Sequence, residues 1–459
     1  MKRNNCYIKG IATLVLFILT IPACKKYLDK KSDESLVVPS TIKDASLLLD
    51  LYGAMNNQYP YVGTLSEDDS YFLDATFNTR PDEDKLIYTW DKQAMVDEDW
   101  TRLYKIVSIA NLAIQTLEEI QVDDANKSEF DRVFGSALFY RGYAFYHIAQ
   151  YFAEPYDKSV ASQKLGIPLR LTADISVPSV RSSMEETYKQ MVNDFLEASK
   201  RLPLNNPPLS RPNKIAAFAA LARLYLTMDE FSLAKGYADS CLNLYSTLMD
   251  YNDPSWVNSS PSAQIPFKRW NPEVIFQATN LGTSIGVPTT GRIDSSLFLM
   301  YGSNDLRRRV FFRTLSPGVG FKGNYDGTRF GSNFSGLAVD EIFLIRAECY
   351  ARLGNITDAM NDLNTLLSTR WAAGTFVLYT ASDASDALRQ ILVERRKELV
   401  GRGLRWFDLR RLNKHSDFAK SLTRLIDGQA YSLPPNDPRY TFPIPRQVIE
   451  HTGMMQNNR

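Results

Sequence analysis

VDEIFLIRAECYARLGNITDAMNDLNTLLSTRWAAG, residues 339–374, has small, aromatic and apolar residues at the spacing of two antiparallel helices joined by a tight turn. The residues that carry this spacing are Ala347, Tyr350, Gly354, Ala359 and Leu363. Two helices approach closely only where small side chains face each other, and a tyrosine fills the space beside the turn. A charged stretch, ILVERRKELVGRGLRWFDLRRL, follows at residues 391–412. The first stretch therefore predicts a helical hairpin.

The same spacing occurs a second time upstream. Ala222, Tyr225 and Ala234 reproduce it within residues 213–245. A recurring spacing of this kind is typical of tetratricopeptide repeats, in which each unit of about 34 residues forms one helix pair. We therefore expect an all-α fold in which tetratricopeptide-like helix pairs form one body, with long irregular loops and a few short strands.

The amino terminus has the pattern of a secretory signal. Basic residues precede an apolar run over residues 11–21, and this run is too short to span a membrane. The sequence Ile-Pro-Ala-Cys that ends at Cys24 is similar to a bacterial lipobox. We predict a signal peptide at residues 1–23, lipidation of Cys24 and a polar tether at residues 24–40. Ordinary secretion, with Cys24 incidental, is the alternative.

Composition limits the partners and the domain organisation. The chain has 53 Lys and Arg against 52 Asp and Glu, so its charge gives no indication of nucleic-acid binding. Cys241 and Cys349 fall on apolar faces of expected helices, where cysteine packs as a small hydrophobe. A disulfide between them is the alternative. We expect residues 41–459 to form a single domain, with an N-terminal part of about 41–250 and a C-terminal part of about 251–459.

Helical periodicity predicts further long helices. The first begins at Thr41, and the next four cover residues 100–117, 134–152, 182–202 and 384–401. The second and third are expected to pair, and residues Ser182 to Glu185 match a capping box that opens the fourth. A short strand is expected at residues 274–278, and the C-terminal residues from Thr441 are expected to be extended.

Two irregular segments interrupt the helical pattern. Residues 56–92 are rich in aromatic and acidic residues without a sustained period, and residues 252–338 contain many glycines and prolines. Long loops in a compact domain are usually functional or disordered, and many aromatic residues argue against disorder. We therefore expect these two segments to build a binding site.

Several motifs, taken in order, resemble those of the SusD/RagB family of Bacteroidetes surface lipoproteins. They are the lipobox at Cys24, Trp100-x-x-Leu-Tyr in a helix ending near Asn111, the aromatic helix Phe139 to Phe152 followed by Gly166-Ile-Pro-Leu, Asn271-Pro-Glu-Val-Ile-Phe, Arg346-Ala-Glu-Cys-Tyr, Glu394-Arg-Arg-x-Glu-Leu, Arg405-x-x-Asp-Leu-Arg-Arg-Leu and Phe442-Pro-Ile-Pro. The resemblance covers nearly the whole chain after the signal peptide. It implies one helical body that carries a loop-built ligand site. It also implies a SusC-type TonB-dependent outer-membrane transporter as partner, over which the lipoprotein sits as a lid and delivers oligosaccharide or, in some members, peptide.

The charged stretch at residues 391–412 is interpreted as structural. Arg395 and Arg402 can pair with neighbouring carboxylates, and Arg405 with Asp408 can lock the turn that precedes it. Because these charges can pair with one another, we expect them to hold helices together. An enzyme would more plausibly have its catalytic acid and base outside this stretch.

A glycosidase is the alternative reading of the aromatic-rich loop, because Asp68, Asp69 and Asp74 form a dense carboxylate cluster there. The three histidines lie far apart without partners at metal-ligand spacing. We expect a protein that is not an enzyme and that needs no metal and no cofactor.

Carbohydrate recognition needs flat aromatic faces and planar polar groups, and both irregular segments supply them. The predicted ligand-binding residues are Asp69, Tyr71, Asn78 and Arg80 from the first segment, with Trp270 and Tyr301 from the second as the opposite wall. Trp90, Trp100 and Trp406 precede or lie within expected helices and are predicted to belong to the core.

We therefore expect a lipid-anchored protein on the cell-surface face of the outer membrane, which captures an oligosaccharide and delivers it to a SusC-type transporter. Two alternatives stay open: a peptide-capturing member of the same family, and a non-enzymatic repeat scaffold for an outer-membrane complex. The two aromatic loops favour capture, because a bare scaffold has no need of them. A panel of glycans and peptides separates the three.

Overall fold

The computed structural model describes residues 38–282, 284–287, 289–328 and 332–459. The predicted signal peptide and Cys24, with most of the tether, lie outside the described residues. Residues 40–459 form one compact unit. Among the described residues, no helix combines the length and the apolar character needed to cross a membrane.

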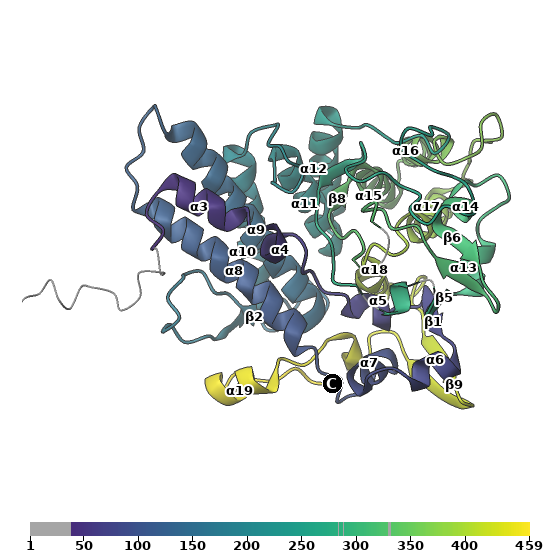
Figure 1. Cartoon of the computed structure of the whole chain (residues 1–459), viewed down its shortest axis with the longest axis horizontal. Helices are drawn as coiled ribbons and strands as arrows, with labels where there is room; N and C mark the ends of the chain where they lie inside the picture. The colour runs from purple at the N-terminus through teal and green to yellow at the C-terminus, as the bar shows by residue number, and fades with distance from the viewer. Residues whose placement is uncertain (1–37, 283, 288, 329–331) are drawn as a thin grey trace, which may run out of the picture. The chain divides into compact units, whose positions relative to one another are not determined.

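Long helices packed in series make the body. They are α3 (Ile42–Leu49), α8 (Asp97–Glu118), α9 (Lys127–Phe152), α10 (Met184–Arg201), α11 (Lys214–Thr227), α12 (Phe231–Leu244), α15 (Val339–Arg352), α16 (Ile356–Ser368) and α17 (Ala384–Glu398). Each of these packs on the next, except that α17 packs mainly on α15. In Figure 1 the series runs from α3 at the left to α16 and α17 at the right. The predicted all-α fold of stacked helix pairs is confirmed.

Both predicted repeats are helix pairs, α11 with α12 and α15 with α16. Ala222 and Ala234 are completely buried where the first pair meets. Tyr225 stacks on Tyr237 with ring centroids 5.5 Å apart. In the second pair, Gly354 has a φ of +82°, which favours glycine at the turn. The small residues therefore act as the sequence predicted.

Charged side chains join the two repeats across α12 and α15. Arg346 lies 3.2 Å from Asp239 and 2.7 Å from Asp362. The ammonium of Lys235 lies 5.1 Å from the centre of the Tyr350 ring. Because these contacts link one hairpin to the next, the repeats stack directly although many residues separate them in sequence.

Short elements lie in the connections between the long helices and in the C-terminal region. They are α4 (Tyr52–Met55), α5 (Val62–Ser66), β1 (Ser70–Phe72), α6 (Asp74–Asn78), α7 (Asp82–Tyr88), β2 (Leu165–Pro168), β3 (Arg181–Ser183), β4 (Val274–Phe276), η1 (Ser284–Gly286), β5 (Gly291–Ile293), α13 (Ser295–Leu299), α14 (Arg307–Phe311), β6 (Phe312–Thr314), β7 (Val319–Phe321), β8 (Leu337–Ala338), α18 (Arg405–Leu412), β9 (Leu422–Ile426), β10 (Gln429–Leu433), η2 (Pro438–Tyr440) and α19 (Arg446–Thr452). The strands pair antiparallel as β1–β5, β2–β3, β4–β8, β6–β7 and β9–β10.

Three local predictions are wrong. The capping box of α10 uses Ser183 and Glu186, one residue later than predicted. Residues 56–92 are not irregular, because they contain α5, β1, α6 and α7. Helices of two turns or fewer are too short to show a period of 3.6 residues. The C-terminal residues are not wholly extended, because α19 lies within them.

The charged stretch of residues 391–412 is buried in ion pairs. Arg307, on α14, lies 2.6 Å from Glu394 and 2.9 Å from Glu398. Arg370 lies 2.7 Å from Glu398 and 2.8 Å from Glu273. Removing one partner of such a pair leaves an uncompensated buried charge. The structural interpretation of this stretch is confirmed.

The partners within the stretch differ in one case from the prediction. Arg402 pairs with Asp340 at 2.9 Å, and Arg395 pairs with Asp408 at 2.8 Å. Arg405, however, does not lock a local turn with Asp408; its Nε lies 2.7 Å from Asp68, in the distant first segment. The sequence shows charges of opposite sign, but the fold decides which ones meet.

The remaining core predictions hold. Trp90, Trp100 and Trp406 are buried. Cys241 and Cys349 are buried free thiols rather than a disulfide, and burial raises the pKa of each. They pack as small hydrophobic side chains.

Candidate functional site

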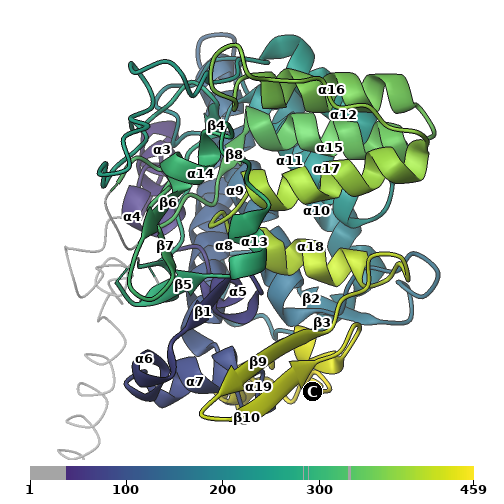
Figure 2. The same cartoon turned by 90° about the vertical axis from the view of Figure 1, so that its right-hand side faces the viewer.

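The two segments predicted to build a site are brought together by strand pairing. Tyr71 on β1 lies opposite Arg292 on β5. The Asp294 backbone N–H donates to the Asp69 carbonyl at 2.9 Å. A Cβ atom placed on Gly318, before β7, would lie 3.4 Å from the Tyr71 hydroxyl. Figure 2 shows β1, β5, β6 and β7 on one side, with the β9–β10 hairpin below them.

A cavity of about 310 Å³ opens between these elements. We call it the β9 cavity. It is lined by Asp68, Ser70, Tyr71, Phe72, Tyr88, Trp90, Asp294, Ser296, Lys420, Ser421, Leu422, Thr423, Arg424 and Leu425. Its walls are therefore β1, the beginning of α13 and β9 with the two residues before that strand. A volume of this size matches the lower end of pockets that hold small ligands.

Arg424 forms part of the floor between two aromatic rings. Its guanidinium carbon lies 3.5 Å from the centre of the Tyr88 ring and 4.5 Å from that of Trp90. Its Nη2 donates to the carbonyls of Leu65 at 2.9 Å and Glu67 at 2.6 Å. Burial lowers the pKa of Arg424 to about 10, so it remains charged at neutral pH. These contacts fix the floor.

Ion pairs from the C-terminal half hold the segment that leads into β1. Asp68 accepts from Arg405 at 2.7 and 3.0 Å and from Lys420 at 2.6 Å. Arg396 Nε donates to Asp69 at 2.7 Å. Burial by itself would raise the pKa of Asp68, but Arg405, followed by Arg396 and Lys420, holds it far below its usual value. Asp68 is therefore ionised and anchors this wall.

The two acidic neighbours of Asp68 behave differently. Burial raises the pKa of Glu67 well above its usual value, and the negative charges of Asp69 and Asp68 raise it further. Burial also raises the pKa of Asp69, although Arg396 and Arg405 oppose the shift. Burial and the neighbouring carboxylates therefore favour the protonated form of Glu67, whereas the surrounding cations favour the ionised form of Asp68.

The β9 cavity presents groups that both donate and accept hydrogen bonds. Hydroxyls come from Ser70, Tyr71, Ser296, Ser421 and Thr423, an ammonium from Lys420 and a carboxylate from Asp294. The half-buried Tyr71 adds an aromatic ring, and Leu425, 71% exposed, adds apolar surface at the rim. Many hydroxyls beside an aromatic face suit a ligand that itself carries many hydroxyls.

The predicted residues of the first segment have different fates. Tyr71 lines the β9 cavity. Asp69 does not line it, because it is buried and paired with Arg396. Asn78, at the end of α6, is exposed and donates to Asp427 at 3.0 Å. Arg80 follows α6 and donates to the Thr76 carbonyl at 3.3 Å.

The predicted second wall is not formed by the two residues named for it. Tyr301 has 0% exposure, and its hydroxyl donates to the Lys397 carbonyl at 2.8 Å, so the structure places it in the core and not at the β9 cavity. It packs in a core cluster with Phe312, ring centroids 5.0 Å apart. Trp270 is half-buried beside Arg269 and is not among the residues that line the β9 cavity.

Sequence reasoning missed the contribution of β9. Thr423 and Leu425 are exposed while Arg424 between them is buried, which is the alternation of a strand with one face to solvent. The turn at Asp427 and Gly428, both with positive φ, is a known hairpin signal. Alternation followed by Asp-Gly was therefore the available sign.

Among the described residues, no group of three or more His, Cys, Asp or Glu side chains is placed to hold a metal ion. Of the three carboxylates named for the glycosidase alternative, Asp68 and Asp69 are ion-paired with arginines, whereas Asp74 is exposed at the start of α6. The geometry of the β9 cavity supports binding through hydrogen bonds and an aromatic face.

Comparison with known proteins identifies the relatives of this chain. A family model described as "Starch-binding associating with outer membrane" matches residues 26–226, and the SusD family model matches residues 339–459. A SusD-like protein, P2, of Formosa agariphila is 22% identical, and the alignment covers 97% of this chain and 98% of that protein.

Solved structures share the fold. A SusD superfamily protein from Bacteroides thetaiotaomicron superposes with a TM-score of 0.75 at 20% identity, covering 91% of this chain and 100% of that one. A SusD-like carbohydrate binding protein from Bacteroides vulgatus superposes with a TM-score of 0.66 at 18% identity, covering 90% and 96%. These structures show the shared fold, and the two family models, over residues 26–226 and 339–459, show that the chain belongs to the SusD/RagB family.

Proposed function

We propose that this chain is a cell-surface lipoprotein that captures an oligosaccharide in the β9 cavity and delivers it to a SusC-type TonB-dependent transporter. The observation that carries the proposal is Tyr71. Tyr71 is half-buried and lines, together with Ser70, Ser421 and Thr423, a cavity built by segments far apart in sequence. A sugar ring offers C–H groups to an aromatic face and hydroxyls to the surrounding polar groups.

Anchoring at the membrane rests on the lipobox-like sequence that ends at Cys24. A triacylated cysteine would hold the protein at the outer membrane without a spanning helix. The description of the matching family model, which includes association with the outer membrane, supports this location. Membership of the SusD/RagB family supports delivery of the captured ligand to a transporter.

The test is a glycan-binding panel with the purified chain and with two variants, Tyr71→Ala and Trp270→Ala. We expect at least one soluble oligosaccharide to bind, and Tyr71→Ala to weaken that binding about tenfold, a change of about 1.4 kcal/mol. Trp270→Ala is the matched control, because Trp270 is a half-buried aromatic residue outside the cavity lining. It should bind as the unaltered chain does.

Two results would overturn the assignment. An equal loss of glycan affinity in Tyr71→Ala and Trp270→Ala would show that the ligand does not bind in the β9 cavity. Binding of peptides alone, with every glycan negative and the fold intact, would replace the oligosaccharide by a peptide. Co-purification of the lipidated chain with an outer-membrane transporter tests the partnership separately. We expect the Cys24→Ser variant to be lost from the membrane fraction and not to co-purify with the transporter.

A further inference from the structure

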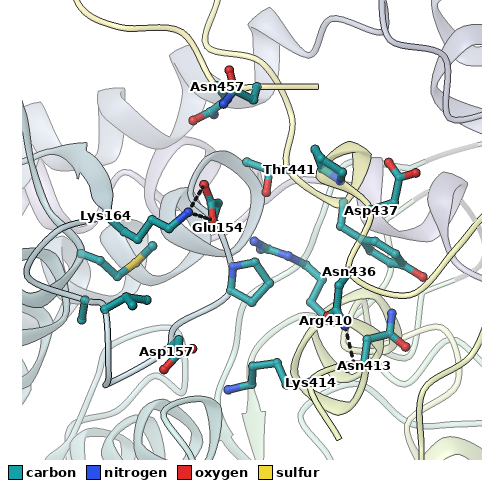
Figure 3. A pocket seen from close by; sticks show the side chains of 17 residues that line it. Glu154, Asp157, Lys164, Arg410, Asn413, Lys414, Asn436, Asp437, Thr441 and Asn457 are labelled. Carbon is teal, nitrogen blue, oxygen red and sulfur yellow. Dashed lines mark hydrogen bonds and ion pairs between the residues drawn. The ribbon is translucent and has the colours of Figure 1, made fainter. Parts of the chain in front are cut away.

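A second cavity lies at the junction of α9, α10, α18 and the C-terminal residues. Its volume is about 470 Å³. We call it the Arg410 cavity. It is lined by Glu154, Pro155, Asp157, Val160, Ala161, Lys164, Met184, Arg410, Asn413, Lys414, Asn436, Asp437, Pro438, Tyr440, Thr441, Asn457 and Asn458, and it shares no residue with the β9 cavity. Figure 3 shows these side chains around the opening.

Arg410 is the unusual member of this lining. Only 2% of the residue is exposed, and Figure 3 shows its guanidinium directed toward the space between Glu154 and Thr441. Its Nη2 donates to the Ala153 carbonyl, whereas Nε and Nη1 have no hydrogen-bond partner among the described residues. A buried guanidinium left this incompletely bonded is costly unless something else supplies acceptors.

A second buried arginine, Arg424, has more hydrogen-bond partners than Arg410. Burial lowers the pKa of both Arg410 and Arg424 to about 10. Arg424 nevertheless donates to the carbonyls of Tyr88, Leu65 and Glu67. Arg410 has one carbonyl only, and no carboxylate of the described chain forms an ion pair with it. The difference lies in partners and not in burial.

The other charges at the rim are already matched. Glu154 pairs with Lys164 at 3.0 Å. Lys414 pairs at 2.6 Å with Asp229, which does not line the cavity. Asp437 similarly pairs with Arg439 at 2.8 Å.

Asp157, also at the rim, accepts from the Ser159 backbone at 2.9 Å and from its hydroxyl at 2.6 Å. Arg410 is therefore the positive group that the cavity leaves without a counter-charge.

The rest of the lining indicates the remainder of a ligand. Asn436, Asn457 and Asn458 contribute amides and Thr441 contributes a hydroxyl, while Met184 is apolar. The Asn457 amide nitrogen donates to the Phe152 and Phe442 carbonyls, and that of Asn436 to the Asn413 carbonyl, so their amide oxygens are the groups left to accept from sugar hydroxyls. The carboxylates at the rim disfavour a second anionic group there.

We propose that the Arg410 cavity binds a carboxylate-bearing sugar, a uronate, with its carboxylate against the Arg410 guanidinium and its hydroxyls toward the asparagine amide oxygens. Arginine is well suited to this role because its N–H groups form short, charge-assisted bonds with carboxylates. The cavity is large enough for a single sugar unit. This site is separate from the capture proposed for the β9 cavity and does not depend on it.

Binding of galacturonate to the purified chain, measured by calorimetry against galactose, tests the charge requirement. Galacturonate should bind and galactose should bind at least tenfold more weakly. Arg410→Gln should lose at least tenfold in galacturonate affinity, whereas Tyr71→Ala should retain it. Equal affinity for the two sugars, no binding of galacturonate, or retention by a folded Arg410→Gln variant would overturn the proposal.

A rim variant keeps the test decisive if Arg410→Gln fails to fold. Asn458 is exposed, so Asn458→Trp should fill the mouth without disturbing the core. We expect at least a tenfold loss of galacturonate affinity with an unchanged urea midpoint. Glu154→Gln removes a rim carboxylate and should leave affinity equal or higher. Full affinity in Asn458→Trp, or a tenfold loss in Glu154→Gln, would contradict an anionic ligand in this cavity.

Discussion

Arg396 Nε lies 2.7 Å from Asp69 Oδ1, so helix α17 of the C-terminal half holds the segment that presents Tyr71 to the β9 cavity. Both side chains are nearly excluded from solvent. The neighbouring Arg405 fixes Asp68 in the same way at 2.7 Å. Helix α17 itself packs on α15 of the second repeat. The stacked helices therefore position the candidate site through ion pairs across more than 300 residues of sequence.

Arg396→Ala is expected to lower the free energy of unfolding by about 3 kcal/mol, because it leaves the buried Asp69 carboxylate without its nearest partner. Ligand binding at Tyr71 should weaken with it. Arg389→Ala is the control, since Arg389 lies on the same helix and is exposed. Urea denaturation measures both. A similar small effect in the two variants would show that the pair does not hold the site.

Gly318→Ala and Gly354→Ala form a matched pair. Their φ angles are +87° and +82°, so each alanine should cost about 1 kcal/mol of stability. A Cβ at Gly318 would lie 3.2 Å from Arg292 and 3.4 Å from Tyr71, whereas one at Gly354 meets nothing within 4 Å.

We therefore expect only Gly318→Ala to weaken glycan binding, although thermal denaturation should show comparable losses of stability for the two. Unchanged glycan affinity in Gly318→Ala would show that the β6–β7 hairpin takes no part in ligand binding.

The helical frame could be predicted from sequence because its signal is local and repeated. The spacing of Ala222 and Tyr225 recurs at Ala347 and Tyr350, and each belongs to a helix of 14 residues, long enough to show its period. Short elements gave no such signal. Helix α6 has 5 residues, and no face of it can be recognised from periodicity.

The candidate site could be predicted only as two segments. Composition indicates that aromatic and polar residues gather in a loop, but it does not indicate the direction of a side chain. Tyr71 faces the cavity, whereas Tyr301 faces a core whose members come from distant parts of the chain. Likewise, the partner of Arg405 is Asp68 rather than the nearby Asp408. Such choices depend on tertiary packing.

Glu348 should make stability sensitive to acid. Burial alone would raise its pKa, but bonds to Arg411 at 2.6 and 2.8 Å, with Arg352 at 3.0 Å, lower the pKa to about 2. A carboxylate with a lowered folded-state pKa stabilises the fold above its unfolded pKa, and this contribution declines as pH falls.

Between pH 6 and pH 3 the decline from Glu348 should be about 2 kcal/mol. Glu348→Gln should unfold more easily at pH 6 by about 3 kcal/mol, because it leaves Arg411 without its carboxylate. Its deficit relative to the unaltered chain should shrink at pH 3. A deficit of equal size at both pH values in urea titrations would contradict the assigned role.

Asp99 should act in the opposite direction. Burial raises its pKa to about 7, although Arg102 and the Val62 backbone N–H oppose the shift. A carboxyl group with a raised folded-state pKa favours the protonated fold, so stability falls as pH rises from its unfolded value toward 7. From pH 5 to pH 8 this loss should be about 3 kcal/mol. Asp99→Asn should remove it, and an unaltered pH slope in that variant would disprove the assignment.

Tyr301→Phe separates a core residue from a ligand contact. The Tyr301 hydroxyl donates to the buried Lys397 carbonyl at 2.8 Å, so its removal should cost about 1 kcal/mol of stability by leaving that acceptor unpaired. The ring itself remains and continues to pack against Phe312. Glycan affinity, measured by calorimetry, should stay within twofold of the unaltered chain. A tenfold loss of affinity at unchanged stability would mean that Tyr301 reaches the ligand after all, and that this part of the core opens when the ligand binds.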